Sequence, residues 1–376
     1  MKILLHSPDE DQIALRSQPF VARLQPLHCP ALPASTAKFS LKPQASYLVT
    51  GGLGALGLIL AEWLADQGAR HLVLVSRRSP NPQQQQTLAA LAERGVNCDV
   101  RSLDVTDADA VAALCAELRQ SPTPLAGLIH AAGSLADGLL LGQTWEQWQR
   151  VLAPKLLGSW NLHQATQADP LDFFVLFSSV ASLLGSPGQG NYAAANAFLD
   201  AIAQTRRAQG QTALSLNWGP WAGAGMAEAV RPNRRLRQGL PLLDPAHCLE
   251  QLSQLLSDPV NDPAHDPDTF QLGLFQADWP LLLQQFPQFK TSGYFQRSPQ
   301  HLRQLRQQIL PQSFWQQRLL QQRLLQLNLQ PKSPFENSCS MPVQNSDRPS
   351  WRTICGMRSP ISSKSTRPPW LLVEVC

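Results

Sequence analysis

Apolar and polar positions alternate in blocks along the central part of the chain. Short, almost continuous apolar runs predict buried strands, and longer stretches with apolar residues at helical spacing predict helices. The predicted strands are 47–50, 71–75, 97–103, 125–130 and 171–177, and the predicted helices are 56–66, 82–94, 108–120 and 144–167. Because strands and helices alternate without a break, we predict an α/β fold, a doubly wound parallel sheet covered by helices on both faces.

A cluster of glycines directly follows the first predicted strand. Gly52-x-Gly54-x-x-Gly57 lies at the junction between that strand and the helix 56–66. Glycine permits a tight turn and a close approach of the backbone to a pyrophosphate, and the helix N-terminus adds unpaired N–H donors. We interpret the junction as a dinucleotide-binding site. An ordinary strand-to-helix turn is the alternative, because glycine-rich turns are common.

The end of the second predicted strand bears on cofactor choice. It carries Ser76, Arg77 and Arg78. A site for NAD usually holds the ribose 2′-hydroxyl with a carboxylate here, whereas arginines favour a 2′-phosphate. We therefore predict NADP(H), against the simpler interpretation that surface arginines often follow strands.

Two helical segments carry candidate catalytic side chains. Tyr192 and Asn196 are four residues apart in an alanine-rich run, which predicts that they share one face of a helix. Lys155 lies in the predicted helix 144–167. From the residues alone, Tyr192 could equally be a packing residue and Lys155 a surface lysine.

Charge and composition argue against several classes of protein. From Thr291 onward there are 11 Lys and Arg against 3 Asp and Glu, so residues 1–290 carry a net charge of −4 and nucleic acid is not an expected partner. Seven cysteines without metal-ligand spacing predict reduced thiols and no metal site. No apolar run reaches about 18 residues, and the N-terminus MKILLHSPDEDQ turns acidic early. We expect no membrane segment, no signal peptide and a cytoplasmic location.

Beyond these single features, the chain resembles the short-chain dehydrogenase/reductase superfamily, and more closely the ketoreductase domains of modular polyketide synthases. The matching motifs run in family order from 46 to 221 and are TGGLGALG, LVSRR, LDVTD, HAAG, PKLLGSWNLH, FSSVASLLGSPGQGNYAAANAFLDA and LNWGPW. The wider superfamily carries Tyr-x-x-x-Lys, whereas this chain has Tyr192-x-x-x-Asn196. Polyketide ketoreductases look as though lysine and asparagine had exchanged places, and Lys155 matches the exchanged position.

The resemblance implies a Rossmann-like fold and NADPH-dependent reduction of a β-ketoacyl thioester, carried on the phosphopantetheine arm of an acyl carrier protein, to the β-hydroxyacyl thioester. It implies that Tyr192 donates the proton, Lys155 stabilises the tyrosinate, Ser179 binds the substrate oxygen and Asn196 serves the proton relay. The implied cofactor contacts are Thr50, Gly51, Gly52, Leu53, Gly54, Gly57, Ser76, Arg77, Arg78, Asp104, Val105, Ala131, Ala132 and Gly133.

Two further positions resemble family determinants of product stereochemistry, and Trp221 is a third candidate position towards substrate. A Leu-Asp-Asp motif goes with one alcohol configuration and a tryptophan eight residues before the tyrosine with the other. This chain keeps the last aspartate as Asp137 and has Leu184 in place of the tryptophan. The pattern favours a D-configured hydroxyl. Trp221 begins a Gly/Ala-rich and then basic stretch to about 240, which we interpret as a lid, with a plain surface loop as the alternative.

The family precedes its catalytic half with a structural half of similar fold. Here 1–28 resembles only the end of that half, 29–44 is expected to be a linker, and 45–290 is expected to be the catalytic domain. We predict a helical linker at 291–330 and a disordered tail at 331–376. Another synthase chain could supply the missing structural half.

Two other functions stay open from the sequence. The chain could be a free-standing carbonyl reductase of small ketones, or a non-catalytic remnant or docking piece of a split synthase. The complete set of Lys155, Ser179, Tyr192 and Asn196 favours an active enzyme.

Overall fold

The computed structural model describes residues 13–15, 19–21, 24–27, 39–223, 239–257, 269–290 and 372–375. The helical linker predicted at 291–330 lies outside the described residues, as do most of the lid and of the tail. Among the described residues, no helix is both long and apolar enough to cross a bilayer.

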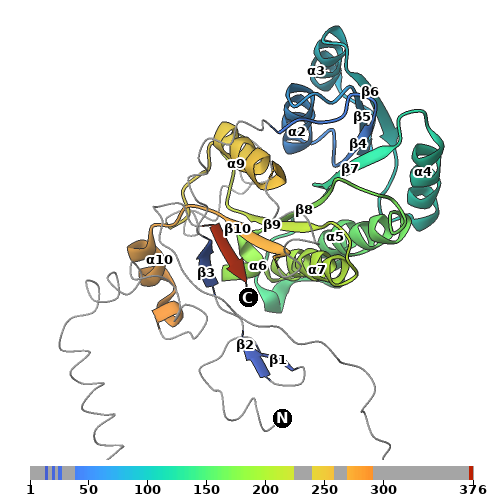
Figure 1. The fold of residues 1–376 in the computed structure, drawn as a ribbon. Coiled ribbons are helices and arrows are strands. Elements are labelled where there is room, and N and C mark those ends of the chain that lie inside the picture. The colour runs from blue at the N-terminus through green and yellow to red at the C-terminus, as the bar shows by residue number, and fades with distance from the viewer. Residues whose placement is uncertain are drawn as a thin grey trace, which may run out of the picture.

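Seven parallel strands form the centre of the fold, in the order β10-β9-β8-β7-β4-β5-β6 (Figure 1). They are β4 (Ser46–Thr50), β5 (His71–Ser76), β6 (Asn97–Ser102), β7 (Leu125–His130), β8 (Phe173–Ser179), β9 (Leu214–Trp218) and β10 (Gln271–Leu274). The chain builds β5 and β6 on one side of β4 and the later strands on the other. The sequence-based prediction of a doubly wound parallel sheet is confirmed, and its switch point lies between β4 and β7.

Helices cover both faces of this sheet, as the two separate hydrophobic clusters show. One face packs against α2 (Ala55–Asp66), α3 (Pro82–Glu93) and α9 (Pro245–Ser257). The other packs against α4 (Ala108–Gln120), α5 (Trp145–Ala165) and α7 (Gly190–Ala208). The shorter helices are η1 (Leu140–Gly142), α6 (Val180–Leu184), α10 (Trp279–Gln285) and η4 (Pro287–Lys290).

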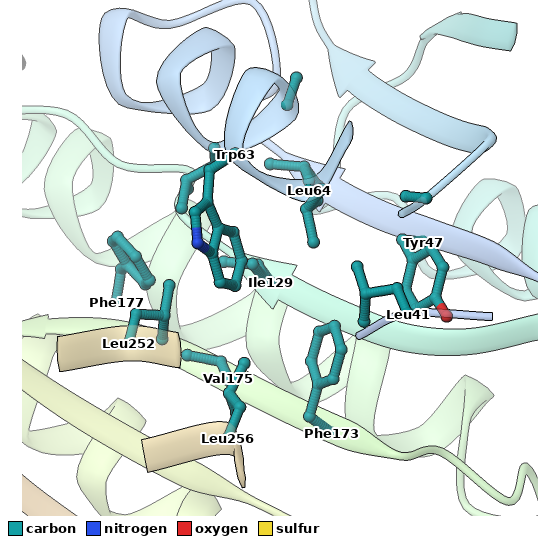
Figure 2. Packing of buried hydrophobic residues seen from close by; sticks show 14 of the residues in the cluster. Leu41, Tyr47, Trp63, Leu64, Ile129, Phe173, Val175, Phe177, Leu252 and Leu256 are labelled. Atoms are coloured by element: carbon teal, nitrogen blue, oxygen red, sulfur yellow. The ribbon is translucent and has the colours of Figure 1, made fainter. Parts of the chain in front are cut away.

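The core beneath α2 and α9 is shown in Figure 2. Trp63 of α2 and Leu252 of α9 both belong to this cluster, and the Trp63 indole N–H donates to Ser253 Oγ at 3.0 Å. Phe39 stacks on Trp63 with ring centroids 5.7 Å apart, and Leu41 is buried nearby. The last part of the segment expected as a linker therefore packs against the domain that begins at residue 45.

Two of the four remaining strands extend the β10 edge of the sheet, and the other two form a separate two-stranded sheet. The separate pair is antiparallel and consists of β1 (Ile13–Leu15) and β2 (Pro19–Val21). The polar sequence Arg-Ser-Gln at 16–18 interrupts the apolar run between them. β3 (Leu24–Leu27) pairs with β11 (Leu372–Val375), and β11 is antiparallel to β10 (Figure 1).

β8 begins and ends two residues later than the apolar run 171–177 predicts. Ser178 and Ser179 are polar, yet they continue the ladder by pairing with Asn217 and Trp218 of β9. Backbone pairing, rather than side-chain polarity, sets the end of this strand. As a result, Ser179 is held as the last residue of a central strand.

Gly127 of β7 allows a close approach of the next strand. A Cβ at this position would lie 2.3 Å from the ring of the buried Phe173 on β8. We expect Gly127→Ala to lower the free energy of unfolding by about 1–3 kcal/mol, because the ring has no free space to enter. Urea unfolding followed by circular dichroism measures this.

Gly142→Ala is the matched control for that substitution. No atom of the described part of the chain lies within 4 Å of a Cβ at Gly142, so the change is expected to stay within about 0.5 kcal/mol. Equal losses in the two variants would contradict the steric account.

Candidate active site

The glycine junction gives the site a backbone-lined wall. Gly51 follows β4 with φ of 69°, and a Cβ on Gly57 would lie 2.2 Å from the Gly51 carbonyl oxygen. Gly54 caps α2 without a side-chain hydrogen bond, so the first N–H groups of the helix have no capping side chain. These features fit the pyrophosphate of a dinucleotide, which needs bare backbone and N–H donors.

Hydrogen bonds connect the ends of β4 and β7 next to the glycine junction. Thr50 Oγ1 lies 2.7 Å from His130 Nδ1, and the Ala132 N–H donates to Thr50 Oγ1 at 3.4 Å. Burial lowers the pKa of His130 to about 3, so its imidazole is neutral at physiological pH. The pair fixes Ala131 and Ala132 beside the glycine junction, where Gly51 packs closely against them.

The other predicted cofactor residues surround the junction. Leu53 is buried, and its carbonyl oxygen accepts a hydrogen bond of 2.6 Å from Gln84 Nε2. Arg77 and Arg78 are exposed beyond the end of β5. Asp104 is exposed and accepts hydrogen bonds from the Thr106 backbone and hydroxyl, and the buried Val105 accepts one through its carbonyl from Asn161.

Lys155 is a buried cation rather than a surface lysine. Lys155 is 3% exposed, and its Nζ donates to the Phe177 carbonyl oxygen at 2.9 Å. Burial lowers the pKa of Lys155 to about 8, while the carboxylate of Asp200 acts in the opposite direction. The ammonium therefore sits at the carboxyl end of β8, close to its change of charge at physiological pH.

Tyr192 lies against Lys155. The Lys155 Nζ is 5.7 Å from the centroid of the Tyr192 ring. Burial raises the pKa of Tyr192, whereas hydrogen bonds from the side chains of Ser179 and Asn196 lower it. The structure therefore brings together all four predicted catalytic residues, although they come from α5, β8 and α7.

Ser179 and Asn196 are each fixed by local hydrogen bonds. Ser179 is the N-cap of α6, and its Oγ accepts from the Ala181 N–H at 3.2 Å. Asn196 Nδ2 donates to the Tyr192 carbonyl at 2.7 Å, while its buried Oδ1 has no hydrogen-bond partner among the described residues. A buried acceptor of this kind is suited to a water molecule.

The three positions predicted for stereochemistry and substrate differ in their surroundings. Both oxygens of Asp137 accept from Gln189 Nε2 at 3.1 Å, which joins the Asp137 loop to the loop before Tyr192. Leu184 ends α6 and is partly buried. Trp221 is 3% exposed and packs edge-on against Trp218 with centroids 5.1 Å apart. Its ring thus has a packing role, and its role towards substrate stays a prediction.

Sequence reasoning missed a link between the loop after β7 and α5, the helix that carries Lys155. Pro154 lies inside α5, directly before Lys155, and has no N–H to donate to the Arg150 carbonyl. The Ser134 hydroxyl donates to that carbonyl instead, at 2.6 Å. A proline in the middle of a helical pattern was the available signal, since it releases one carbonyl for another partner.

Comparison with known proteins agrees with this geometry. The family model described as KR domain matches residues 45–223. A solved ketoreductase domain from the bacillaene assembly line is 30% identical, with a TM-score of 0.64, over 76% of this chain and 67% of that chain. The chain belongs to the ketoreductase family of polyketide synthases.

Two other relatives support the assignment. A solved structure of A-type ketoreductases from a modular polyketide synthase is 38% identical, with a TM-score of 0.66, over 76% of this chain and 58% of that one. The 6-methylsalicylic acid synthase of Aspergillus niger is 42% identical over 235 residues, which are 59% of this chain and 13% of the synthase. The chain thus corresponds to a small part of such a synthase, and the family implies a nicotinamide cofactor.

We expect Ser134→Ala to lower the free energy of unfolding by about 0.5–1.5 kcal/mol, because the Arg150 carbonyl loses its partner. In a Pro154→Ala background, the new backbone N–H can bond that carbonyl within the helix. The serine substitution should then cost nothing further. Urea unfolding of the four proteins of this double-mutant cycle measures the coupling, and strictly additive losses would disprove the link.

Proposed function

We propose that this ketoreductase uses NADPH to reduce a β-ketoacyl thioester, carried on an acyl carrier protein, to the β-hydroxyacyl thioester. The observation that carries the proposal is the convergence of Lys155, Ser179, Tyr192 and Asn196 on one partly buried site. The reaction belongs to polyketide biosynthesis or a fatty-acid-like pathway. The solved ketoreductases and the synthase relatives support this class of reaction.

The glycine junction and the basic end of β5 support the choice of cofactor. Gly51, Gly57 and the uncapped start of α2 would hold the pyrophosphate. Arg77 and Arg78 are exposed where a 2′-phosphate would lie, and no carboxylate competes at that strand end. The nicotinamide, when bound, supplies a hydride to the carbonyl carbon of the substrate.

Tyr192 would donate the proton that the substrate oxygen needs. Because burial raises its pKa, the phenol keeps its proton until the oxygen becomes basic during reduction. Ser179 would hold that oxygen in place through its hydroxyl. The Lys155 ammonium, near the face of the Tyr192 ring, would stabilise the tyrosinate left behind, and Asn196 Oδ1 would hold a water that returns the proton.

The product configuration follows from the Asp137 loop. Asp137 is fixed by Gln189 next to the catalytic tyrosine, while Leu184 leaves that side without a tryptophan. We propose a D-configured hydroxyl.

The deciding experiment is NADPH consumption at about 340 nm with a β-ketoacyl N-acetylcysteamine thioester as substrate. We expect turnover by the purified chain and a loss of at least about 100-fold in kcat for Tyr192→Phe, which lacks the proton donor. The matched control is Tyr47→Phe, whose hydroxyl accepts from the backbone N–H of Lys42 near the amino end of β4, the end opposite the glycine junction. A simple ketone reduced as efficiently as the thioester would favour the free-standing reductase, and no turnover with either substrate would overturn the proposal.

The cofactor preference has its own test. Replacing Arg77 and Arg78 by alanine should raise KM for NADPH by about 10-fold or more, because two cations that would neutralise the 2′-phosphate are removed. KM for NADH should change little. The control is Arg94→Ala, since Arg94 is paired with Asp66 at the surface. Equal effects on both cofactors would contradict the predicted 2′-phosphate contact.

A further inference from the structure

Asp200 is a buried carboxylate that the proposed reaction does not use directly. It is 7% exposed and lies on α7 four residues after Asn196 and eight after Tyr192. This spacing places the three side chains along one face of the helix. Asp200 therefore lies two turns below the catalytic tyrosine, inside the protein.

Asp200 accepts hydrogen bonds from three residues on two neighbouring elements. Oδ1 accepts from Ser215 Oγ at 2.6 Å and Oδ2 accepts from Ser182 Oγ at 2.9 Å. Asn217 Nδ2 lies 3.1 Å from both oxygens. Ser215 and Asn217 belong to β9 and Ser182 to α6, so one carboxylate joins α7, β9 and α6.

Asn217 extends this cluster to the catalytic serine. Its Nδ2 lies 3.0 Å from Ser178 Oγ and 3.3 Å from the Ser179 carbonyl oxygen. Ser178 Oγ in turn donates to the Asn196 carbonyl at 3.3 Å. Asp200 therefore binds the group, Asn217, that contacts the Ser179 backbone. The same hydrogen-bonded cluster also joins the end of β8 to the helix that carries Asn196.

The same carboxylate also lies near the charge of Lys155. Lys155 Nζ donates to the carbonyl of Phe177, the residue before Ser178, and Asn217 connects Ser178 to Asp200. The ionisable groups that act on Lys155 or contact it are Asp200 and Tyr192 from α7 and the neutral His130 from β7. Of these, only Asp200 can carry a negative charge that offsets the buried ammonium without taking part in proton transfer. Burial raises the pKa of Asp200, and the hydrogen bonds from its neighbours oppose that rise.

We propose that Asp200 is a positioning residue of the ketoreductase, which fixes Ser179 through Asn217 and serves as the internal counter-charge of Lys155. The inference rests on the proposed function for its effect on turnover. Its effect on Lys155 can be measured in the free protein, without substrate or cofactor.

Asp200→Asn removes the charge and keeps the shape of the side chain. The hydroxyls of Ser182 and Ser215 can turn to accept from the new amide, so we expect folded protein. Without the carboxylate, the ammonium of Lys155 is less stabilised. Its titration midpoint, near 8 in the native protein, should fall by about one pH unit.

NMR of protein labelled at lysine Cε measures this titration directly, with the Lys155 signal assigned from a Lys155→Met variant. Asp172→Asn is the matched control, since it removes a carboxylate that pairs with Lys42 at 2.8 Å. This control should leave the Lys155 midpoint unchanged. An unchanged midpoint in Asp200→Asn would overturn the counter-charge role, whether or not the chain turns over.

Turnover separates the two parts of the role. In Asp200→Asn, kcat should fall by about 10-fold at neutral pH and its loss at high pH should begin at lower pH, because the cationic lysine is needed. Asp200→Glu should restore the native pH at which kcat begins to fall, which we call the basic limb of the pH profile. A purely structural aspartate would lower kcat without moving the limb, and that result would overturn the proposal.

Asn217→Ala keeps the charge of Asp200 and breaks the link to Ser179. We expect kcat to fall by about 10-fold while KM for NADPH and the basic limb stay unchanged. Native kcat in this variant would disprove the positioning of Ser179. If the native chain itself does not reduce the thioester, the proposed function fails, and the NMR titration still decides the relation between Asp200 and Lys155.

Discussion

The site depends on an ammonium group held inside the protein. Lys155 is 3% exposed, and its pKa is lowered to about 8, mainly by burial. The native state therefore releases the Lys155 proton more readily than the unfolded chain does. Below about pH 8 the buried charge lowers the free energy of unfolding. The cost shrinks as pH rises from about 8 towards the ordinary lysine value of about 10.4. The Phe177 carbonyl, the Tyr192 ring and the Asp200 carboxylate compensate part of it.

This compensation requires the end of β8 and two helices to keep their relative positions. Lys155 comes from α5, Tyr192 from α7, and the accepting carbonyl from β8. α5 and α7 pack on the same face of the sheet through residues such as Leu162 and Leu199. Hydrophobic packing therefore sets the distance between the lysine and the tyrosine, and the polar groups at the strand end fix their orientation.

Sequence reasoning predicted the sheet and most elements because apolar runs and glycine turns are local signals. The shared helix face of Tyr192 and Asn196 was equally accessible, since it follows from helical spacing. Whether Lys155 reaches them depends on which strands are neighbours, and only the resemblance supplied that pairing. Asp200 gave no signal in sequence, because a polar residue four positions after Asn196 is indistinguishable from a surface residue. Trp221 shows that a sequence motif can also mislead, since this residue, predicted to act towards substrate, packs in the core.

The candidate site has a half predicted to hold the cofactor and a half predicted to be catalytic, and the two use different physical means. The cofactor half depends on the absence of side chains, because a Cβ at Gly57 would collide with the Gly51 carbonyl. The catalytic half depends on buried polar side chains whose hydrogen bonds offset their desolvation, from Lys155 through Asn217 to Asp200. Substitutions that add a side chain are therefore expected to disrupt the first half, whereas substitutions that remove a charge or a hydrogen-bond donor are expected to disrupt the second. This division explains why the glycine junction is recognisable in sequence, while the polar support of the catalytic residues becomes visible only in the folded protein.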